Sequence, residues 1–532
     1  MTTCGEALIG FLEQYGIDTI FGIPGVHTVE LYRGLGNSKI RHITPRHEQG
    51  AGFMADGYAR ASGRPAACFI ITGPGLTNIA TALGQAYGDS IPMLVISSVN
   101  RRDELALGEG RLHELPSQRN LMAGLTAFSH TLMRADELPQ VLARAFTVFR
   151  SARPRPVHIE IPLDVITATA DDLRAKILSD LGRPSPDPAR IAAAAALLRS
   201  AKRPLVVLGG GAQDAAGEAR SLVERLGAPT LMTVNAKGIL PPGHPLSLGS
   251  SLSQPPIREE LASADVVLAV GTELGETDTM LFESRPRFGG KLIRIDIDAV
   301  QLVRNALPDV AIASDAALAL KALLGELQPT SPSRSQARRV QDLREQVEAL
   351  YTDRQKLHRR LFSALQQALP DVLIVGDSTQ PVYSANLFFE AERPRSFFNA
   401  ATGYGTLGYA LPAALGAKLA QPDRPVAVVI GDGGIQFTIG ELATAVELGL
   451  PLSILLWNNH GYNEIREYMA DRGIPQIGVD IYTPDLLAIA RGFGCEAVRV
   501  QSLPQLQDEL RKSQARTGPS VIEIDEADAR RW

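Results

Sequence analysis

The stretch VAVVIGDGG, residues 426–434, determines the fold of the C-terminal third of this 532-residue chain. Its apolar run from Val426 to Ile430 predicts a buried parallel strand that ends in a glycine turn. The sequence then predicts a helix over 438–448 and a second strand over 452–456, followed by WNNHGY at 457–462. Strand, turn, helix and strand form one βαβ unit, so the glycine turn and the WNNHGY segment lie at the same carboxyl edge of a parallel sheet.

Both segments carry groups suited to a metal-bridged diphosphate. Asp432 offers carboxylate oxygens and Asn459 an amide oxygen, and these are ligands that Mg²⁺ and Ca²⁺ prefer. Gly433 and Gly434 let backbone N–H groups approach phosphate oxygens closely. A Gly-Asp-Gly sequence alone is typical of a surface turn, but the Asn-Asn pair and the βαβ setting favour a diphosphate site.

The pattern resembles the diphosphate-anchoring motif of thiamin diphosphate enzymes, which opens with Gly-Asp-Gly and closes with Asn-Asn. The spacing matches as well, because Asp432 and Asn459 lie 459 − 432 = 27 residues apart. The resemblance implies that Asp432, Asn459 and the Gly461 carbonyl bind Mg²⁺. It also implies that the cofactor, thiamin diphosphate, contacts Gly433, Gly434, Asn459, Gly461 and Tyr462.

Along the chain, helical patterns alternate with short apolar strands in three segments, and a length of 532 residues suits about three domains. This alternation predicts an α/β fold of three doubly wound parallel-sheet domains, over 1–170, 188–327 and 345–532. Residues 171–187 and 328–336 are aperiodic and contain Pro, which is typical of linkers. The remaining predicted strands are Thr19–Gly22, Ala67–Ile71, Met93–Ser97, Val157–Ile161, Pro204–Leu208, Thr230–Val234, Val266–Val270, Leu292–Ile297 and Val372–Val375.

Composition excludes several classes of protein. The net charge of −5, without a Lys/Arg stripe, argues against nucleic-acid binding. Cys4, Cys68 and Cys495 lack metal-ligand spacing, which indicates free thiols in a reducing compartment, and Cys68 is expected in the core of a strand. No secretory signal opens the chain, and no apolar run of roughly 18 residues could span a membrane. We therefore expect a cytoplasmic protein.

The first segment supplies a second match to the same family. RHEQGAGFMADGYAR, residues 46–60, resembles the pyrimidine-domain signature, in which the first Glu activates the aminopyrimidine ring of the cofactor. Such activation needs a carboxyl group in a water-poor pocket, where desolvation keeps it partly protonated. Taken alone, Glu48 is only a favourable partner for a helix dipole. Beside the diphosphate motif, the resemblance implies that Glu48 is catalytic.

Three loops also resemble loops of the family that reach its active site: FGIPG at 21–25, TGPGLTN at 72–78 and GYGTLGY at 403–409. Leu407 matches the large apolar residue that holds the cofactor in a bent form. The resemblance implies further cofactor contacts at Pro24, Gly25, Asn78, Ser378, Thr379, Gly403, the Gly405 carbonyl and Leu407.

The resemblance covers essentially the whole chain, in the order pyrimidine-binding, middle and diphosphate-binding domain. It belongs to the group of pyruvate decarboxylases and acetolactate synthases. Because Glu48 and Asp432 lie on different domains, the family assembles each site from two chains. The resemblance therefore implies a homodimer at least, and family members are commonly tetramers.

Three side chains are candidates for proton transfer beside the cofactor: His27, His113 and Glu464. Each departs from the pattern of pyruvate decarboxylases. His113 stands alone where those enzymes carry a His-His pair, Val26 occupies the place of their Asp, and Glu464 follows Asn459 by five residues rather than six. A loop histidine is as often a hydrogen-bonded structural residue as a catalyst, so both interpretations stay open.

Acetolactate synthases carry a flavin near an Arg-containing segment, whereas GTELGETD at 271–278 has no Arg. This difference argues against bound FAD, which stays an open alternative. The acidic residues of the segment could pair with a cationic substrate tail, or simply face solvent. GIPGVHT at 22–28 and GYNEIR at 461–466 resemble the decarboxylases of 5-guanidino-2-oxopentanoate. Gly209–Gly211 suggest a nucleotide loop only superficially, and a tight turn accounts for them better.

The sequence therefore predicts a thiamin diphosphate-dependent enzyme that converts a 2-oxo acid, with a long or basic side chain, into an aldehyde and CO₂. One alternative is a carboligase of the acetolactate synthase type, which condenses the decarboxylated acid with a second carbonyl compound. Another is a regulatory homologue that only binds the cofactor, and the intact Glu48, Asp432 and Asn459 argue against it.

Overall fold

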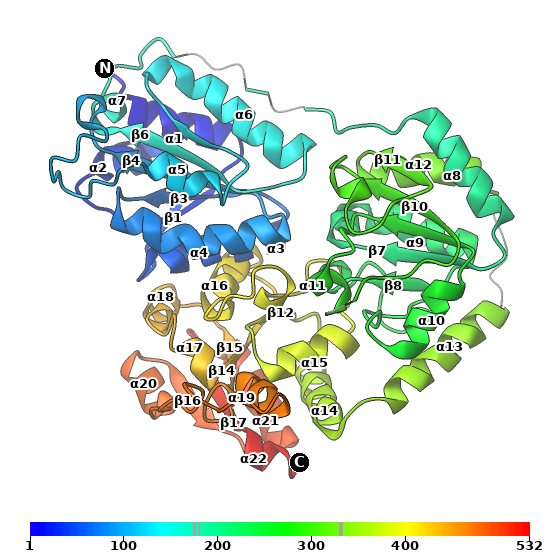
Figure 1. Cartoon of the computed structure of the whole chain (residues 1–532). Coiled ribbons are helices and arrows are strands. Elements are labelled where there is room, and N and C mark those ends of the chain that lie inside the picture. The colour runs from blue at the N-terminus through cyan, green and yellow to red at the C-terminus, as the bar shows by residue number, and fades with distance from the viewer. Residues whose placement is uncertain (174–176, 179–180, 283, 329–333) are drawn as a thin grey trace. The chain divides into compact units, whose positions relative to one another are not determined.

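The structure is a computed structural model that describes residues 1–173, 177–178, 181–282, 284–328 and 334–532. Helices surround three β-sheets, which confirms the predicted α/β class (Figure 1). The chain divides into two compact units. The first comprises residues 1–182, 404–499 and 512–523, and the second comprises residues 183–403, 500–511 and 524–532.

The first sheet lies in the first unit and has the strand order β2-β1-β3-β4-β6-β5, with parallel pairing throughout. Strands β3, β4 and β6 are buried over every residue, as a parallel sheet covered on both faces requires. Helices α1 and α6 cover one face, and α3 and α4 the other (Figure 1). The strands are β1 (Thr19–Gly22), β2 (Arg41–Ile43), β3 (Ala66–Ile70), β4 (Met93–Val99), β5 (Ser129–Thr131) and β6 (Val157–Pro162). The helices are α1 (Cys4–Gln14), α2 (Val29–Tyr32), α3 (Glu48–Ser62), α4 (Pro74–Asp89), α5 (Gln118–Ala123), α6 (Leu138–Ser151) and α7 (Leu163–Ile166).

Helix α3 packs on α16 (Ala410–Ala420) with almost no space between the two backbones. A Cβ atom on Gly57 would lie 1.9 Å from the carbonyl oxygen of Ala413, and one on Gly416 would lie 1.8 Å from that of Met54. Only glycine permits such an approach. The glycines of α3 and α16 therefore serve this helix pair, which joins the N-terminal part of the first unit to its C-terminal part.

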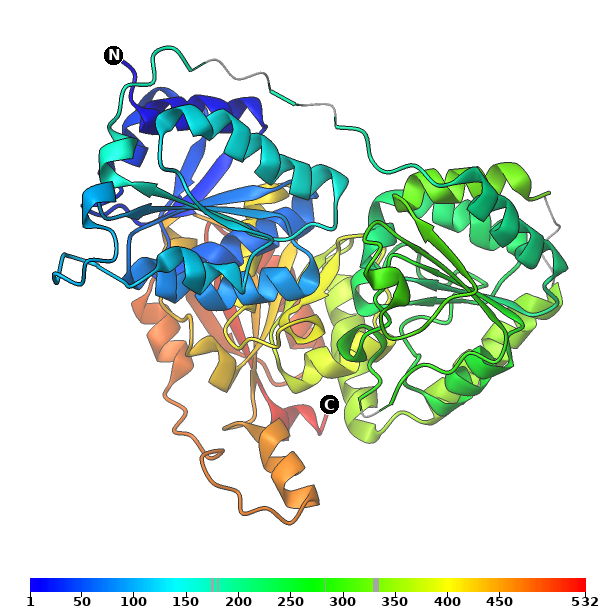
Figure 2. The same cartoon turned by 45° about the horizontal axis from the view of Figure 1, so that its top comes forward.

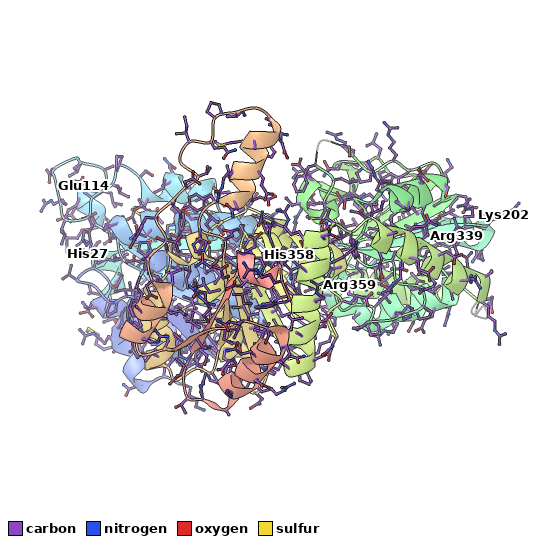
Figure 3. The ribbon with its side chains drawn as sticks, turned by 90° about the horizontal axis from the view of Figure 1, so that it is seen from below. His27, Glu114, Lys202, Arg339, His358 and Arg359 are labelled. Carbon is purple, nitrogen blue, oxygen red and sulfur yellow. The ribbon has the colours of Figure 1, made fainter. Side chains whose placement is uncertain are left out.

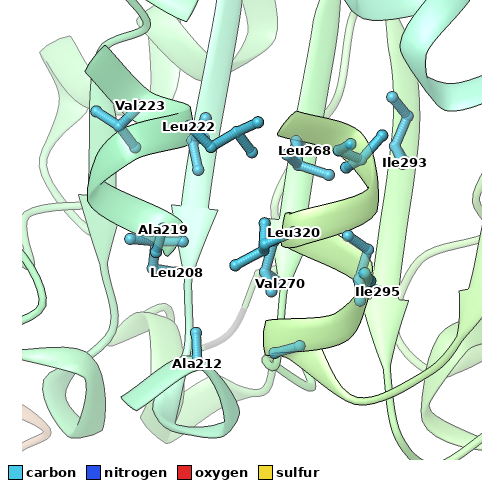
Figure 4. Close-up of a cluster of buried hydrophobic side chains, with 14 of the residues drawn as sticks. Leu208, Ala212, Ala219, Leu222, Val223, Leu268, Val270, Ile293, Ile295 and Leu320 are labelled. Carbon is cyan, nitrogen blue, oxygen red and sulfur yellow. The ribbon is translucent and has the colours of Figure 1, made fainter. Parts of the chain in front are cut away.

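The second sheet has the order β11-β10-β9-β7-β8, again with parallel pairs. Side chains of β7, β9 and β10 meet those of α9 and α12 in one apolar core (Figure 4). The strands are β7 (Pro204–Leu208), β8 (Thr230–Met232), β9 (Val266–Val270), β10 (Lys291–Asp296) and β11 (Val310–Ala313). The helices are α8 (Pro188–Ser200), α9 (Ala216–Leu226), α10 (Pro255–Ser263), α11 (Glu276–Thr279) and α12 (Ala316–Glu326).

The glycine run at 209–211 is a tight turn, as the sequence favoured. The N–H of Gly209 donates to Val270 O (2.8 Å) and that of Gly211 to Gly271 O (3.0 Å). These amides bind the end of β9, so they are not available to a phosphate.

The third sheet has six strands, and β12 pairs with β13, β14 with β15 and β16 with β17, all parallel. The strands are β12 (Leu373–Gly376), β13 (Phe397–Asn399), β14 (Val426–Gly431), β15 (Ser453–Asn458), β16 (Glu496–Arg499) and β17 (Ser520–Asp525). Besides α16, the helices are α13 (Arg334–Ala349), α14 (Asp353–Ala368), α15 (Gln380–Phe388), α17 (Asp432–Ile435), α18 (Glu441–Glu447), α19 (Asn463–Asp471), α20 (Leu486–Gly492), α21 (Leu503–Ala515) and α22 (Glu526–Ala529). Helix α19 buries no residue and, with the segment after it (orange), extends outward in Figure 2.

The helix predicted over 438–448 was wrong at its start. The chain forms the short α17 directly after β14, turns, and begins α18 only at Glu441. The Thr438 hydroxyl donates to Gly408 O (2.7 Å), a long-range contact that fixes the turn. Each predicted linker includes residues that lie outside the described ranges. In the second linker, residues 334–336 belong to α13.

Two expectations from composition can be compared with the structure. Cys4, Cys68 and Cys495 are buried free thiols, as their spacing indicated. Among the helices of the described ranges, none has the length and apolar character needed to cross a bilayer.

Candidate functional site

Asp432 follows β14 directly and is almost fully buried, with 1% of its surface exposed. Its carboxylate accepts hydrogen bonds from the Gly461 N–H (3.1 Å) and the Thr483 hydroxyl (2.9 Å). The N–H of Asn459 lies 3.4 Å from the same group. Burial raises the pKa of Asp432 despite these donors. A cation beside the carboxylate would offset this desolvation and favour the ionised form.

The side-chain amide of Asn459 completes this corner. One of its two terminal atoms lies 2.9 Å from Gly461 O and 3.1 Å from Asp432 Oδ1. With nitrogen in that place the amide donates two hydrogen bonds, and with oxygen there three oxygen atoms converge. Carboxylate, amide and carbonyl oxygens are the ligands that Mg²⁺ and Ca²⁺ prefer. With the amide oxygen turned inward, this corner offers three such oxygens to a divalent cation.

The loop at 404–409 lies against the turn after α17. A Cβ atom on Gly408 would lie 2.6 Å from the Cβ of Phe437. The hydroxyl of Thr406 donates to the side chain of Gln85 on α4 (2.9 Å). Gly405 is exposed and Leu407 is half-buried at the tip of the loop. Tyr462, on the other motif, packs its ring against Gly433. The first unit thus brings both halves of the C-terminal motif together with α4.

Glu48 is the first residue of α3 and is half-buried. The Asn78 amide donates to its Oε2 (3.0 Å), and a Cβ atom on Gly75 would lie 3.2 Å from its Oε1. The loop at 72–78 and the start of α3 therefore meet at the Glu48 carboxylate.

A residue that sequence reasoning missed holds this region in place. Glu441 begins α18, is 1% exposed, and accepts hydrogen bonds from the N–H groups of Arg46 (3.0 Å) and His47 (3.2 Å). It also accepts from the Thr444 hydroxyl (2.7 Å). Burial raises the pKa of Glu441. The helix that follows the diphosphate turn is therefore bonded to the two residues that precede Glu48. A Glu directly before the apolar run LATAV, residues 442–446, was the signal available in the sequence.

His27 and His113, which are 86 positions apart, meet edge to face with ring centroids 5.2 Å apart. In both rings Nδ1 is buried without a hydrogen-bond partner among the described atoms. Burial, assisted by His113, lowers the pKa of His27, while Glu104 opposes the shift. Figure 3 shows His27 and Glu114, the neighbour of His113, on the same side of the first unit. Both histidines were candidates from the sequence, but the sequence did not predict that their rings are in contact.

A buried polar network supports the loop that carries His113. The N–H of Gly73, whose φ is +68° and therefore suits only glycine well, donates to Gln118 Oε1 (2.6 Å). A Cβ atom on Gly73 would lie 2.6 Å from His113 O. Gln118 Nε2 donates in turn to Ser98 O (2.9 Å) and Glu160 Oε2 (3.4 Å). Gln118, Ser98 and Glu160 were not found from the sequence, because none of the three stands in a motif.

Comparison with known proteins decides the family. Residues 2–121 match the thiamine pyrophosphate enzyme N-terminal TPP binding domain, residues 191–323 the central domain, and residues 377–524 the C-terminal TPP binding domain. A probable 2-ketoarginine decarboxylase of Pseudomonas aeruginosa is 49% identical, over 99% of this chain and 95% of that protein. This chain belongs to the thiamine pyrophosphate enzyme family. The family and the cofactor, thiamin diphosphate, were therefore predicted correctly.

Two further matches have lower sequence identity. The large subunit of acetolactate synthase isozyme 1 from Escherichia coli is 34% identical, over 98% of this chain and 93% of its own length. A solved structure of a putative thiamin diphosphate-dependent enzyme from Mycobacterium smegmatis superposes with a TM-score of 0.82 at 24% identity, covering 99% of both chains. That likeness supports the fold alone.

The remaining predicted residues of this thiamine pyrophosphate enzyme have the following surroundings. The Gly25 N–H is bound by the Thr28 hydroxyl (2.9 Å), and Pro24 before it is exposed. In the second unit, Thr379 precedes α15 and is buried, and the Ser378 N–H donates to Asp377 Oδ1 (2.9 Å). Gly403 is half-buried and is the last residue of the 183–403 part of the second unit. In the first unit, Glu464 is exposed on α19.

The acidic segment 271–278 is only partly free to face solvent. The Thr272 hydroxyl donates to Asp278, and the buried guanidinium of Arg294 donates to Thr272 O (2.8 Å). Burial lowers the pKa of Arg294, and the nearby Asp278 and Glu273 oppose this. The Thr277 hydroxyl donates to Thr402 O (2.6 Å). The segment is therefore attached one residue before Gly403, where the predicted cofactor loop begins.

Proposed function

We propose that this enzyme catalyses the non-oxidative decarboxylation of a 2-oxo acid to an aldehyde and CO₂. The observation that carries the proposal is the 49% identity over 99% of the chain to a probable 2-ketoarginine decarboxylase. Acetolactate synthase, the alternative, is 34% identical. When bound, thiamin diphosphate supplies the electron sink that stabilises the carbanion left by loss of CO₂.

The cofactor would be held through Mg²⁺ at the corner formed by Asp432, Asn459 and the Gly461 carbonyl. The carboxylate, the side-chain amide and the backbone carbonyl that meet in this corner support a hard cation of this kind. Further contacts would come from Gly433, Gly434, Tyr462, Gly405, Leu407, Pro24, Gly25, Asn78, Ser378, Thr379 and Gly403. Glu48, with its bond from Asn78, would exchange a proton with the aminopyrimidine ring.

His27 and His113 would supply the proton that replaces CO₂ on the substrate carbon. Two imidazoles 5.2 Å apart cannot both be charged without mutual repulsion, and the lowered pKa of His27 keeps it neutral near pH 7. Their unpartnered Nδ1 atoms leave hydrogen-bonding capacity for a ligand. Glu464 is the third candidate donor.

The substrate would be 5-guanidino-2-oxopentanoate, the acid named in the relative as 2-ketoarginine. A guanidinium group needs carboxylate partners. Glu276 is exposed and Glu273 half-buried on a segment that Thr277 attaches to Thr402. These two carboxylates are our candidates for binding the guanidinium.

The working enzyme would be a cytoplasmic homodimer or tetramer without FAD. Large apolar side chains on α19 and after it support an oligomer, because a surface of this kind needs a partner. They are Ile465, Tyr468, Ile474, Ile477 and Tyr482, between 46% and 86% exposed.

The test is product analysis with the purified chain, thiamin diphosphate and Mg²⁺. We expect CO₂ and 4-guanidinobutanal in equal amounts from 5-guanidino-2-oxopentanoate. 2-Oxohexanoate, whose side chain is uncharged, should be a much poorer substrate by kcat/KM. Glu276→Gln should reduce the preference for the guanidino substrate. A 2-hydroxy ketone as the main product would reject decarboxylation in favour of a carboligase, and absence of turnover with any 2-oxo acid would reject both.

A further inference from the structure

A cavity of about 210 Å³ lies wholly within the second unit. It is formed by α13, α14, the end of α15 and the segment 242–257. Of the described residues that line it, none is a proposed cofactor or catalytic residue. A cavity of this size has room for a small organic molecule.

The floor of this cavity is aromatic and apolar. The rings of Phe362 and Phe388 lie 5.9 Å apart, those of Phe362 and Phe389 5.6 Å, and those of Tyr351 and Phe388 6.4 Å. Leu248, Ile257, Val347 and Leu387 complete it, each no more than 9% exposed. Such a floor favours an apolar or aromatic group.

Four charged side chains of alternating sign surround the opening. Arg344 pairs with Glu390 (3.0 Å) and Arg359 with Glu348 (2.8 Å). All four act on the hydroxyl of Tyr351, whose pKa burial raises to about 12, with the arginines opposing and the glutamates adding to the shift. Figure 3 shows Arg359 on α14. A simple anion or cation would meet repulsion from half of this set, whereas a molecule carrying both charges is complementary to it.

The outer ion pair can exchange partners at low cost. The side chains of Arg359 and Glu348 are 44% and 42% exposed, and exposed pairs contribute little to stability. The inner pair is more fixed, because Glu390 also accepts the Gly243 N–H (3.2 Å).

We propose that this cavity binds an α-amino acid in its dipolar form, with an apolar or aromatic side chain. Its carboxylate would bind Arg359, its ammonium group Glu348 or Glu390, and its side chain the floor of Phe362 and Phe388. His358 on α14 is bonded to Ser384 on α15 (2.8 Å), and α15 begins directly after Ser378 and Thr379. A ligand here would therefore rest against the helices that lead to two proposed cofactor contacts, although the binding itself does not depend on the proposed function.

The test is calorimetric titration of the full-length protein with L-phenylalanine and with two analogues that each lack one charge. L-Phenylalaninamide lacks the carboxylate and 3-phenylpropanoate lacks the ammonium group. We expect each to bind at least about tenfold more weakly than L-phenylalanine. No binding of L-phenylalanine or L-leucine at about 10 mM, or equal affinity for all three phenyl compounds, would overturn the proposal.

Variants on the exposed side of α14 locate the site. Arg359→Met should weaken L-phenylalanine at least about tenfold but leave L-phenylalaninamide unchanged, because only the first carries a carboxylate. Ser363→Trp, at the opening, should block binding, whereas the exposed Gln367→Trp on the next turn should not. Catalytic turnover should be unchanged in all three. Wild-type affinity in both Arg359→Met and Ser363→Trp would refute this location.

Discussion

The bond between Glu441 and the residues before Glu48 is the contact we would perturb first. Glu441→Ala removes the acceptor of the Arg46 and His47 N–H groups and of the Thr444 hydroxyl. Arg46 and His47, which lead into α3, would then no longer be hydrogen-bonded to α18. If the attachment positions the Glu48 carboxylate, the change should reduce catalysis more than it reduces cofactor binding.

The magnitude follows from the contacts. A hydrogen bond to a charged group contributes about 1.5–3 kcal/mol. Loss of the two backbone bonds is partly offset because a desolvated carboxylate, evident in its raised pKa, is removed as well. We expect the free energy of unfolding to fall by about 2–3 kcal/mol. A displacement of Glu48 by about 1 Å would lower kcat by roughly 100-fold.

The assay compares kcat at saturating thiamin diphosphate, cofactor affinity by calorimetry, and urea denaturation. Glu447→Ala is the matched control, because Glu447 lies on the same helix and pairs with the Arg46 guanidinium, but is 58% exposed. It should change the unfolding free energy by less than about 1 kcal/mol and leave kcat near the wild-type value. Glu441→Gln, which keeps one acceptor oxygen, should fall between the two. Wild-type kcat in Glu441→Ala, or a loss confined to cofactor affinity, would refute the positioning role.

Three further changes have defined outcomes. Glu48→Gln should bind thiamin diphosphate normally but lose at least about 100-fold in kcat, since an amide cannot exchange the proton; turnover near that of the wild type would contradict its role. Gln118→Ala should lower the unfolding free energy by about 2 kcal/mol, because it leaves the buried Gly73 N–H unpaired, and an unchanged urea midpoint would contradict this. Burial lowers the pKa of His158 to about 3 from 6.5, so the stability that neutral His158 contributes is lost as the pH falls from 6.5 toward 3. Because of this group, the free energy of unfolding should be about 2 kcal/mol lower at pH 5 than at pH 6.5. His158→Gln should remove that part of the pH dependence.

The central strands of the sheets could be predicted because they are continuous apolar runs. β1, β7 and β9 have the predicted bounds, and all three are buried over nearly every residue. β2 and β5 were missed because they are strands of three residues at the edges of the first sheet, where one side has no neighbour and burial is incomplete. Such strands depend on pairing with distant residues rather than on their own pattern.

The candidate site divides in the same way. Asp432 and Asn459 could be found because they stand at fixed spacing in one βαβ unit. Glu441, Gln118 and Thr483 could not, because each acts through hydrogen bonds to loops far away in the sequence. Local patterns identify the groups that we propose to touch the cofactor, whereas the groups that orient them depend on the tertiary fold.

The most direct test of the account is a calorimetric titration of thiamin diphosphate into protein stripped of metal by a chelator, with and without Mg²⁺. The corner of Asp432, Asn459 and the Gly461 carbonyl predicts one cofactor per chain when Mg²⁺ is present, weak or no uptake without it, and loss of the Mg²⁺ effect in Asp432→Asn. Uptake that ignores the metal, or no uptake under either condition, would contradict the central claim.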